Sequence, residues 1–431
     1  MQKNSREISV HIISEIYNDK SFEDAINDNQ NYVKLDDRDK SLVRMITLTF
    51  FRRNGEVNHV IKKYLKKSVD KKIMNILRVG ATQILFLNIP HYSVVNTSVN
   101  LSKKKIYKLS GLVNAILRKI SMDKEKLMNE LDPIMNLPDW IKIDWIKSYG
   151  EEKTRKFARI FSKKPPLDIN IKEKKFSERN WEEHLDGEKI YKQVIRLNRN
   201  GLVTDLPFFD RGDWWVQSAS ASIPVEIINE FFKKDIKEKI KVLEVGAAPG
   251  GKTFQLCDNN YDLTAIDISK KRIKKLEENL KRLNFSPKII NADILEFKTN
   301  KIFDCVLIDS PCSASGIVSR NPDILLRNKK DLLKGLLHKQ MQILVKCSSL
   351  LKVEGIMVYV VCSLISDEGK NQIKYFLKKN KGFKMKKVSK NILNGLKYKL
   401  TDGMLTINPD DYENIGGMDG FFIACIEKTD I

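Results

Sequence analysis

Three segments of this chain place reactive or ligand-binding residues directly after an apolar run. A glycine-rich loop, Gly-Ala-Ala-Pro-Gly-Gly-Lys-Thr at residues 246–253, follows Val-Leu-Glu-Val. Cys312 and Cys362 each come after an apolar run of their own. Ligands of open α/β sheets bind outside the carboxyl ends of the strands. The spacing therefore predicts that a cofactor loop and two thiols meet at one sheet edge, which is typical of a cofactor-dependent enzyme with cysteine chemistry.

The glycine-rich loop fits two kinds of ligand. Residues 246–253 match G-x-x-x-x-G-K-[ST], the pattern of a loop that cradles phosphates with backbone N–H groups, and Asp309 would end a second strand as its acid. Pro249 has no N–H to donate, which weakens this interpretation. A nucleoside site instead needs an acid about 20 residues further on, and Asp267 stands there. Together with Asp293 and Asp309 it would suit a cationic cofactor such as a sulfonium.

The elements that must position these groups alternate along the C-terminal part of the chain. Helical stretches such as residues 269–283 separate most of the apolar runs, so βαβ units and a parallel sheet are expected. The last run follows a loop rich in Asp, Asn and Gly, and we expect it to pair antiparallel near an edge. The predicted strands span residues 240–245, 263–267, 288–292, 303–309, 355–361 and 421–427.

The N-terminal part of the chain has a different pattern. Apolar residues recur at helical spacing through residues 1–130, which predicts an all-helical module with its own core. A cluster of prolines then marks a change of organisation. We expect a small α+β connecting segment over 131–235 and the catalytic sheet over 236–431. The adjacent Trp214 and Trp215 are interpreted as core residues rather than as a base-stacking platform.

Charge and composition limit the partners. The 431-residue chain has 77 Lys and Arg against 55 Asp and Glu, a formal net charge of +22. Such an excess favours a polyanionic partner, with nucleic acid first, although an AT-rich genome would also enrich Lys. No signal-like start and no run of ~18 apolar residues are present, so we expect no membrane partner. Cysteine spacing argues against zinc and disulfides, and a cytoplasmic protein with reduced thiols is predicted.

Several motifs together carry a family resemblance. The loop Ala-Ala-Pro-Gly-Gly-Lys-Thr, Asp-Ser-Pro-Cys-Ser-Ala-Ser-Gly at 309–316 with Arg-Asn-Pro-Asp at 320–323, Val-Cys-Ser at 361–363 and the tail at 419–424 resemble those of RNA cytosine-5 methyltransferases. Residues 78–90 and 111–118 resemble the NusB-type RNA-binding domain. That pairing is characteristic of the bacterial Sun/Fmu (RsmB) family of 16S rRNA methyltransferases.

The resemblance implies a fold and an activity. The fold would be an α/β Rossmann-like methyltransferase domain with a mostly parallel seven-stranded sheet, preceded by an all-α NusB-like domain and a small α+β linker domain. The activity would be transfer of a methyl group from S-adenosyl-L-methionine to C5 of a specific cytosine in 16S rRNA. We expect the substrate to be naked or partly assembled RNA, and the enzyme to be a monomer that does not act on DNA.

Roles for single residues follow from the same resemblance. A thiolate that adds to C6 of cytosine makes C5 nucleophilic, which is covalent catalysis. Cys362 is expected to be this nucleophile, Cys312 to help release the adduct, and Asp309 to hold the base, with Lys252 orienting Asp309 or the substrate. No metal is expected. The expected cofactor-binding residues are Gly246, Ala247, Ala248, Pro249, Gly250, Gly251, Lys252, Asp267, Asp293 and Asp309.

Four positions depart from the family pattern. Gly246 replaces a Cys and Glu244 an Asp, and neither should matter to a loop that works through its backbone. Val361 replaces the Thr before the nucleophile and Ser366 a Pro after it, so the positioning of Cys362 is open to question.

Related functions require residues that this chain lacks or predict others than it has. A DNA cytosine-5 methyltransferase would attack with the Pro-Cys thiol, but Ser313 stands where that class has Gln, and no Glu-Asn-Val triplet follows. Cytosine methylation of tRNA or another RNA is the nearest alternative. A P-loop nucleotide hydrolase and a non-catalytic RNA-binding assembly factor are more distant, and the retained thiols and strand-end acids argue against the latter.

Overall fold

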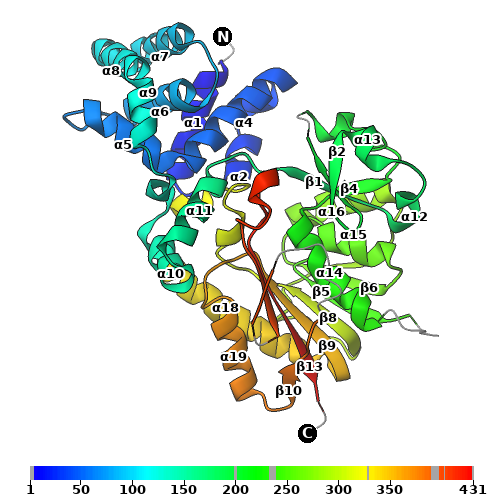
Figure 1. Ribbon diagram of the computed structural model, residues 1–431. Coiled ribbons are helices and arrows are strands. Elements are labelled where there is room, and N and C mark those ends of the chain that lie inside the picture. Colours follow the sequence, from blue (N-terminus) through cyan, green and yellow to red (C-terminus); the bar gives the residue numbers. More distant parts are fainter. Residues whose placement is uncertain are drawn as a thin grey trace. The chain divides into compact units, whose positions relative to one another are not determined.

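The chain divides into two compact units in the computed structural model, which describes residues 4–198, 201–232, 239–327, 330–389, 398–401 and 403–429. The helical unit comprises Met1–Lys164 and Ile317–Lys329, and the sheet unit comprises Pro165–Gly316 and Lys330–Ile431 (Figure 1). The predicted division into three domains, with boundaries at residues 130 and 235, stays a prediction, because the two compact units do not show which part performs which function.

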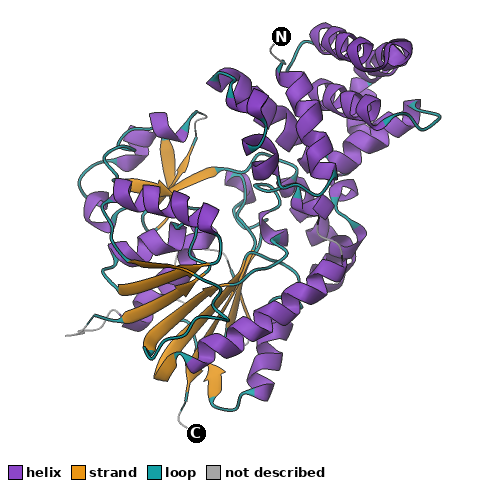
Figure 2. Ribbon diagram, turned by 180° about the vertical axis from the view of Figure 1, so that it is seen from behind, coloured by secondary structure: helices purple, strands orange, loops and turns teal. Residues whose placement is uncertain are grey.

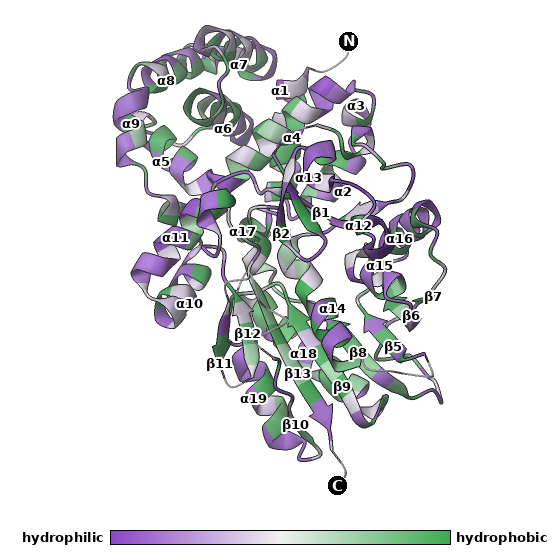
Figure 3. Cartoon of the chain, turned by 45° about the vertical axis from the view of Figure 1, so that its right-hand side comes forward, coloured by the Kyte–Doolittle hydropathy of each residue, from purple (hydrophilic) through white to green (hydrophobic). Residues whose placement is uncertain are grey.

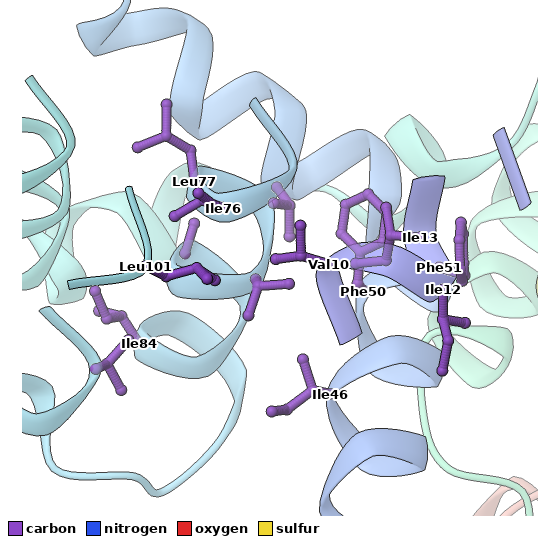
Figure 4. Packing of buried hydrophobic residues seen from close by; sticks show 14 of the residues in the cluster. Val10, Ile12, Ile13, Ile46, Phe50, Phe51, Ile76, Leu77, Ile84 and Leu101 are labelled. Atoms are coloured by element: carbon purple, nitrogen blue, oxygen red, sulfur yellow. The ribbon is translucent and has the colours of Figure 1, made fainter. Parts of the chain in front are cut away.

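The helical unit consists of amphipathic helices around one apolar core. Asn4 and Asp36 accept hydrogen bonds from N–H groups in the first turns of α1 and α4, which satisfies donors that a helix start leaves open. Ile13, Phe50 and Leu77 are buried where α1, α4 and α6 meet (Figure 4). The all-α prediction for this part is confirmed. Its helices are α1 (Ser5–Tyr17), α2 (Phe22–Asn27), α3 (Gln30–Val33), α4 (Asp37–Arg52), α5 (Asn54–Tyr64), α6 (Lys71–Phe86), α7 (His91–Ile106), α8 (Ser110–Met122), α9 (Lys124–Glu130), α10 (Asp139–Tyr149), α11 (Glu151–Phe161) and α17 (Ile324–Arg327), with 3-10 turns η1 (Tyr107–Leu109) and η2 (Pro133–Asn136).

A segment from the C-terminal half of the chain belongs to the helical unit. The turn η4 (Ser315–Ile317) leads into it. Arg52 donates through Nε to the carbonyl of Ser319 at 2.7 Å, and Asp323 accepts from the Phe22 N–H at 3.2 Å. Burial and the charge of Arg320 lower the pKa of Arg52 to about 10. The sequence motif at 320–323 is therefore packed into the helical unit.

The sheet unit begins with a small antiparallel sheet in the order β2-β3-β1-β4. Arg196 and Asp168 form a buried ion pair in it, at 2.7 Å, and Arg196 also donates to the carbonyls of Ile415 and Gly417. Trp214 and Trp215 are buried, which confirms their interpretation as core residues. The elements are β1 (Leu167–Ile171), α12 (Glu173–Phe176), α13 (Trp181–Leu185), β2 (Gly187–Tyr191), β3 (Val194–Leu197), η3 (Val203–Asp205) and β4 (Trp214–Val216).

The main sheet is mixed and mostly parallel, as predicted. Its order is β11-β12-β13-β9-β8-β5-β6-β7, with β10 paired to β13, and β9, β8, β5, β6 and β7 are mutually parallel. Two expectations were wrong. The described residues form nine strands rather than seven, and β13 is antiparallel but lies inside the sheet, because the β11–β12 hairpin pairs beyond it. The strands are β5 (Lys241–Val245), β6 (Asp262–Asp267), β7 (Lys288–Asn291), β8 (Phe303–Asp309), β9 (Leu351–Val361), β10 (Phe383–Met385), β11 (Lys399–Thr401), β12 (Met404–Ile407) and β13 (Phe421–Lys428).

Helices cover both faces of this sheet (Figure 2). The helix α14 contacts β9 and β13, whereas α18 contacts β8 and β9. Strands buried on both faces are apolar along their length, and β8, β9 and β13 are accordingly hydrophobic over most of their residues (Figure 3). The remaining elements are α14 (Ala219–Phe232), α15 (Gly251–Asp258), α16 (Lys270–Leu283), α18 (Lys330–Ser349), α19 (Lys370–Lys379) and η6 (Glu413–Ile415). Among the described helices, none is both long and apolar enough to cross a membrane.

Candidate active site

The glycine-rich loop turns tightly between β5 and α15. Gly246 has a φ of +81°, and a Cβ built on it would lie 2.4 Å from the carbonyl oxygen of Asp309. Gly250 has a φ of +119°, and a Cβ there would lie 2.3 Å from the Phe254 ring. Only glycine tolerates these positions without a shift of its neighbours. The loop therefore lies directly against the end of β8, as the strand-end argument predicts.

Asp267, at the end of β6, is tied to the loop. Its carboxylate accepts from the N–H of Ala248 at 3.0 Å and of Ser269 at 2.8 Å, and Arg272 donates to it at 3.0 Å. Two of these three hydrogen bonds go to Oδ1 and one to Oδ2. Because a carboxylate has about four acceptor positions, Oδ2 keeps room for one further donor.

The other two strand-end acids pair with lysines. Asp293 follows β7, accepts from the Leu295 N–H and lies 3.4 Å from Lys339 Nζ. Asp309 ends β8 and accepts from Lys252 Nζ at 2.7 Å. This contact was anticipated as one of two roles for Lys252.

Lys252 is a nearly buried cation in this site. Burial acts to lower the pKa of its ammonium, but the carboxylates of Asp309 and Glu244 and the thiol of Cys362 act in the opposite direction, and the pKa is raised. The ammonium also lies 5.8 Å from the centre of the Phe421 ring, in the tail motif. Lys252 thus links the cofactor loop, the end of β8 and the second cysteine.

The two cysteines lie together although 50 residues separate them. Their Sγ atoms are 3.5 Å apart, within hydrogen-bonding distance. The hydrogen bond to Cys362 and burial raise the pKa of Cys312 well above its usual range. Cys312 therefore holds its proton at neutral pH.

The buried side chain of Glu368 connects the two loops that carry Cys312 and Cys362. Glu368 accepts from the Ser313 N–H at 2.7 Å and from the hydroxyls of Ser313 and Ser363, each at 2.5 Å, and Gln340 donates to it at 3.1 Å. Ser313 and Ser363 directly follow Cys312 and Cys362. Burial raises the pKa of Glu368. Sequence reasoning missed this residue, although a serine after each cysteine was a signal of shared partners.

The other residues singled out in the sequence lie close to these contacts or are buried in the sheet unit. Gly316 donates to the Cys362 carbonyl at 3.0 Å, and Gly420 of the tail motif donates to the Gly316 carbonyl at 2.7 Å. Val361, one of the departures from the family pattern, is buried in β9 opposite Phe422. The other four cysteines are buried or half-buried, and burial raises the pKa of each; they are Cys257, Cys305, Cys347 and Cys425. In the described ranges no group of His, Cys, Asp and Glu could hold a metal ion.

Comparison with known proteins agrees with the two-part pattern. Residues 233–427 match the model of the 16S rRNA methyltransferase RsmB/F family, and residues 3–122 match the NusB family. The ribosomal RNA small subunit methyltransferase B of Photorhabdus laumondii is 30% identical over 412 residues, with 91% of each chain covered. The probable enzyme of the same name from Synechocystis is 29% identical over 405 residues, covering 88% of this chain and 89% of its own.

Solved structures support the fold. PH0851 superposes with a TM-score of 0.74 at 21% identity, covering 99% of this chain and all of its own. NSun6 from Pyrococcus horikoshii gives 0.57 at 17% identity, over 68% of this chain and 99% of its own.

The fold and the site define a methyltransferase that uses S-adenosyl-L-methionine. The chain belongs to the RsmB/F family of 16S rRNA methyltransferases.

The site fits this cofactor. The glycine-rich loop approaches the end of β8 closely, as a loop that presents its backbone to a ligand must. The free acceptor position on Asp267 Oδ2 suits a ribose hydroxyl. The phosphate-loop alternative fits less well, because Lys252 is already bound by Asp309 rather than free for a triphosphate.

The first prediction concerns Asp267. Replacing it in Asp267→Ala should weaken S-adenosyl-L-methionine binding by about 1–3 kcal/mol, because a charged acceptor for the ribose is lost. Asp267→Asn, which keeps the size of the side chain, should lose less. Calorimetric titration measures both. Magnesium-dependent ATP binding that persists in Asp267→Ala would instead revive the phosphate-loop interpretation.

The second prediction concerns pH. Glu244 is 1% exposed and accepts from the Thr253 hydroxyl, and burial raises its pKa to about 8 from an ordinary 4.5. Between pH 4.5 and about 8 the folded state therefore binds more protons than the unfolded state. The contribution of protonated Glu244 to the free energy of unfolding is fully present below pH 4.5 and is lost as the pH rises through the folded-state pKa of about 8. Glu244→Gln should remove that loss.

Thermal melts from about pH 5 to about pH 8.5 test this, with exposed Glu278→Gln as control. The melting temperature of wild type relative to Glu244→Gln should fall as pH rises, whereas Glu278→Gln should follow wild type. A constant difference across the range would contradict the assignment.

Proposed function

We propose that this enzyme methylates C5 of a cytosine in 16S rRNA through a covalent bond between Cys362 and C6 of the base. One observation carries the proposal: two thiols lie 3.5 Å apart beside the Lys252–Asp309 ion pair, at the strand ends that hold the cofactor loop. The names of the relatives and of the family support 16S rRNA as the substrate.

The chemical steps divide among few groups. The Cys362 thiolate forms a bond to C6, which places electron density on C5. S-adenosyl-L-methionine supplies the methyl group, which C5 takes up as the bond to the sulfonium breaks. A base then removes the proton from C5. The electron pair of the broken C5–H bond forms the C5–C6 double bond, and the bond between C6 and Cys362 Sγ breaks to release the thiolate. A nearby cation stabilises a thiolate, and Lys252, which interacts with Cys362, is that cation.

The surroundings of Cys312 favour its protonated thiol. The raised pKa of Cys312 keeps this thiol protonated, so its Sγ can donate to Cys362. The family resemblance assigns the attack to Cys362 and release of the adduct to Cys312, and the distance of 3.5 Å between their Sγ atoms supports joint action of the two thiols. Asp309, held at the end of β8, binds N3 or the exocyclic amine of the base, with Lys252 orienting it.

The cofactor would be held by residues from four strand ends, those of β5, β6, β7 and β8. The loop at 246–252 presents its backbone, Asp267 binds the ribose, and Asp293 and Asp309 line the neighbouring strand ends. The NusB-like residues 1–130 would bind RNA, 131–235 would connect and contact RNA, and 236–431 would perform the chemistry. The net charge of +22 supports the RNA contacts.

Glu368 is proposed as a positioning residue. It touches neither thiol but fixes the serines that follow each of them, so it sets the distance between Cys312 and Cys362. A buried carboxylate is stable only when hydrogen bonds satisfy it, and this one has four.

The test of the function is a pair of cysteine variants. Cys362→Ala should abolish methyl transfer, by a factor of about 10⁴ or more, with cofactor affinity unchanged, because the thiol acts on the base. Cys312→Ala should accumulate a protein–RNA adduct that survives a denaturing gel. The measurement is transfer of labelled methyl groups to a 16S rRNA transcript, followed by bisulfite sequencing.

The outcomes of this pair are easily distinguished. An adduct in Cys362→Ala and none in Cys312→Ala would exchange the two roles and support a DNA-type mechanism. Methylation of tRNA in preference to 16S rRNA would move the enzyme to the nearest alternative substrate. Cys347→Ala, which removes a buried thiol away from both loops, serves as the control and should retain activity.

The prediction for Glu368 compares two variants. In Glu368→Gln, the amide oxygen can still accept from the Ser313 N–H, and its NH₂ can donate to the two serine hydroxyls, so fold and most activity should remain. Glu368→Ala leaves the donors unpaired and should slow single-turnover methyl transfer about tenfold or more. Cofactor affinity should stay unchanged.

A second measurement tests whether Glu368 positions the thiols or only stabilises the fold. The alkylation rate of Cys362 in folded Glu368→Ala should differ from wild type, since the loop that holds the thiol has moved. An unchanged alkylation rate, with activity lost only in proportion to unfolded protein, would contradict the positioning role.

A further inference from the structure

A groove lies on the helical unit between α7 and α8, which are labelled in Figure 1. Its volume is about 480 Å³. The groove is lined from α7 by Tyr92, Val95 and Asn96 and from α8 by Asn114, Arg118 and Met122. A volume of this size is within the range of small-ligand sites, roughly 300–1,000 Å³. The α7–α8 groove is therefore large enough for a nucleotide.

Two large side chains that line the groove are exposed to solvent. Tyr92 is 80% exposed and Met122 is 84% exposed, one on each helix. The floor is apolar, because Val95 and Val99 are partly buried against the helical core. An aromatic ring in water above an apolar floor is the arrangement on which unpaired bases stack.

The polar lining favours an anionic ligand. No residue that lines the groove is acidic. In the part of the chain that the structure describes, Arg118 and Asn114 form no hydrogen bond or ion pair, and Arg118 is exposed. His91 is held by the Ser121 hydroxyl at 2.7 Å. The guanidinium and the amide are thus available to a ligand.

The same helix pair carries further positive charge at its other end. Exposed Lys103 and Lys104 lie in the last turn of α7, and exposed Lys108 lies in η1 before α8. Cations that follow the backbone of a strand, together with an exposed aromatic ring, are the combination that binds single-stranded nucleic acid.

We propose that the α7–α8 groove binds an unpaired nucleotide of single-stranded RNA. Tyr92 stacks on the base, Asn96 or Asn114 contacts its edge, Arg118 binds the phosphate, and the lysines bind the strand that follows. The inference rests on the proposed function, since it takes RNA as the substrate, and adds to it a recognition site separate from the residues of the chemistry.

The experiment uses full-length protein with fluorescein-labelled dodecauridine and a blunt RNA duplex of the same length. Tyr92→Ala should weaken binding of the single strand about tenfold and leave duplex binding unchanged. Arg118→Gln should also weaken it, and the slope of log affinity against log salt should become shallower by roughly 0.7. Both side chains are exposed, so both variants should melt as wild type does.

Two matched controls separate the groove from general effects. Tyr375→Ala removes a tyrosine that is 53% exposed on α19, and Arg38→Gln removes an exposed arginine of α4 outside the groove. Both should bind dodecauridine within about twofold of wild type. If Tyr92→Ala binds as Tyr375→Ala does, or Arg118→Gln loses no more than Arg38→Gln, the proposal is overturned and net charge accounts for the binding.

The proposed function is tested separately in the same series. Methylation of the 16S rRNA transcript by wild type, together with unchanged RNA affinity in the groove variants, would refute the groove and retain the function. Loss of dodecauridine binding in the groove variants, with no methylation by wild type, would retain the groove and refute the function.

Discussion

The candidate active site depends on the parallel pairing of β8 with β9. Asp309 is paired with Val360 in this register, so the two strands end at the same edge. Cys312 follows the end of β8 by three residues and Cys362 directly follows the end of β9, and their sulfur atoms lie 3.5 Å apart although the two residues are 50 positions apart in the chain. Because both strands are buried on both faces, the pairing cannot slip without exposing apolar residues to water. The strand pairing thus brings both thiols to one edge of the sheet, and the hydrogen bonds of Glu368 to Ser313 and Ser363 hold the two loops together there.

The second constraint is the burial of ionisable side chains at these strand ends. Lys252, Glu244, Asp267 and Glu368 are all nearly buried. A buried polar or charged group without a partner would destabilise the fold, but each of these groups has one: an opposite charge, a backbone N–H or a hydroxyl. Networks in which every member is satisfied hold side chains in one arrangement. The contacts that make the burial of these groups tolerable therefore also orient the loop and the thiols before any ligand binds.

The route of the chain joins the chemistry to the helical unit. The chain leaves the Cys312 loop at Gly316, and from Ile317 it is part of the helical unit, where Arg52 and Phe22 bind it. A fragment that begins at residue 236 would lack Arg52 and Phe22, which bind Ser319 and Asp323 in the whole chain. The roles of the two units are therefore better separated by point variants in the whole chain than by cutting it. The groove proposed on α7 and α8 would give the helical unit a recognition function of its own.

The amino-acid sequence alone determined most element types and predicted the residues of the candidate site. Helical and strand periodicity are local, and so are the loop at 246–253, the strand-end acids and the residues around each cysteine, so all of these could be predicted. The hairpin β11–β12 was missed because its strands are short, and it places two further strands between β13, which was expected near an edge, and the end of the sheet. Only the tertiary structure showed that Glu368, which follows the polar turn Ser-Asp, binds the serines next to both cysteines, and that residues 317–329 join the helical unit. These are contacts between residues far apart in the chain, and which partner a buried charge finds depends on how whole strands and helices pack rather than on neighbouring residues.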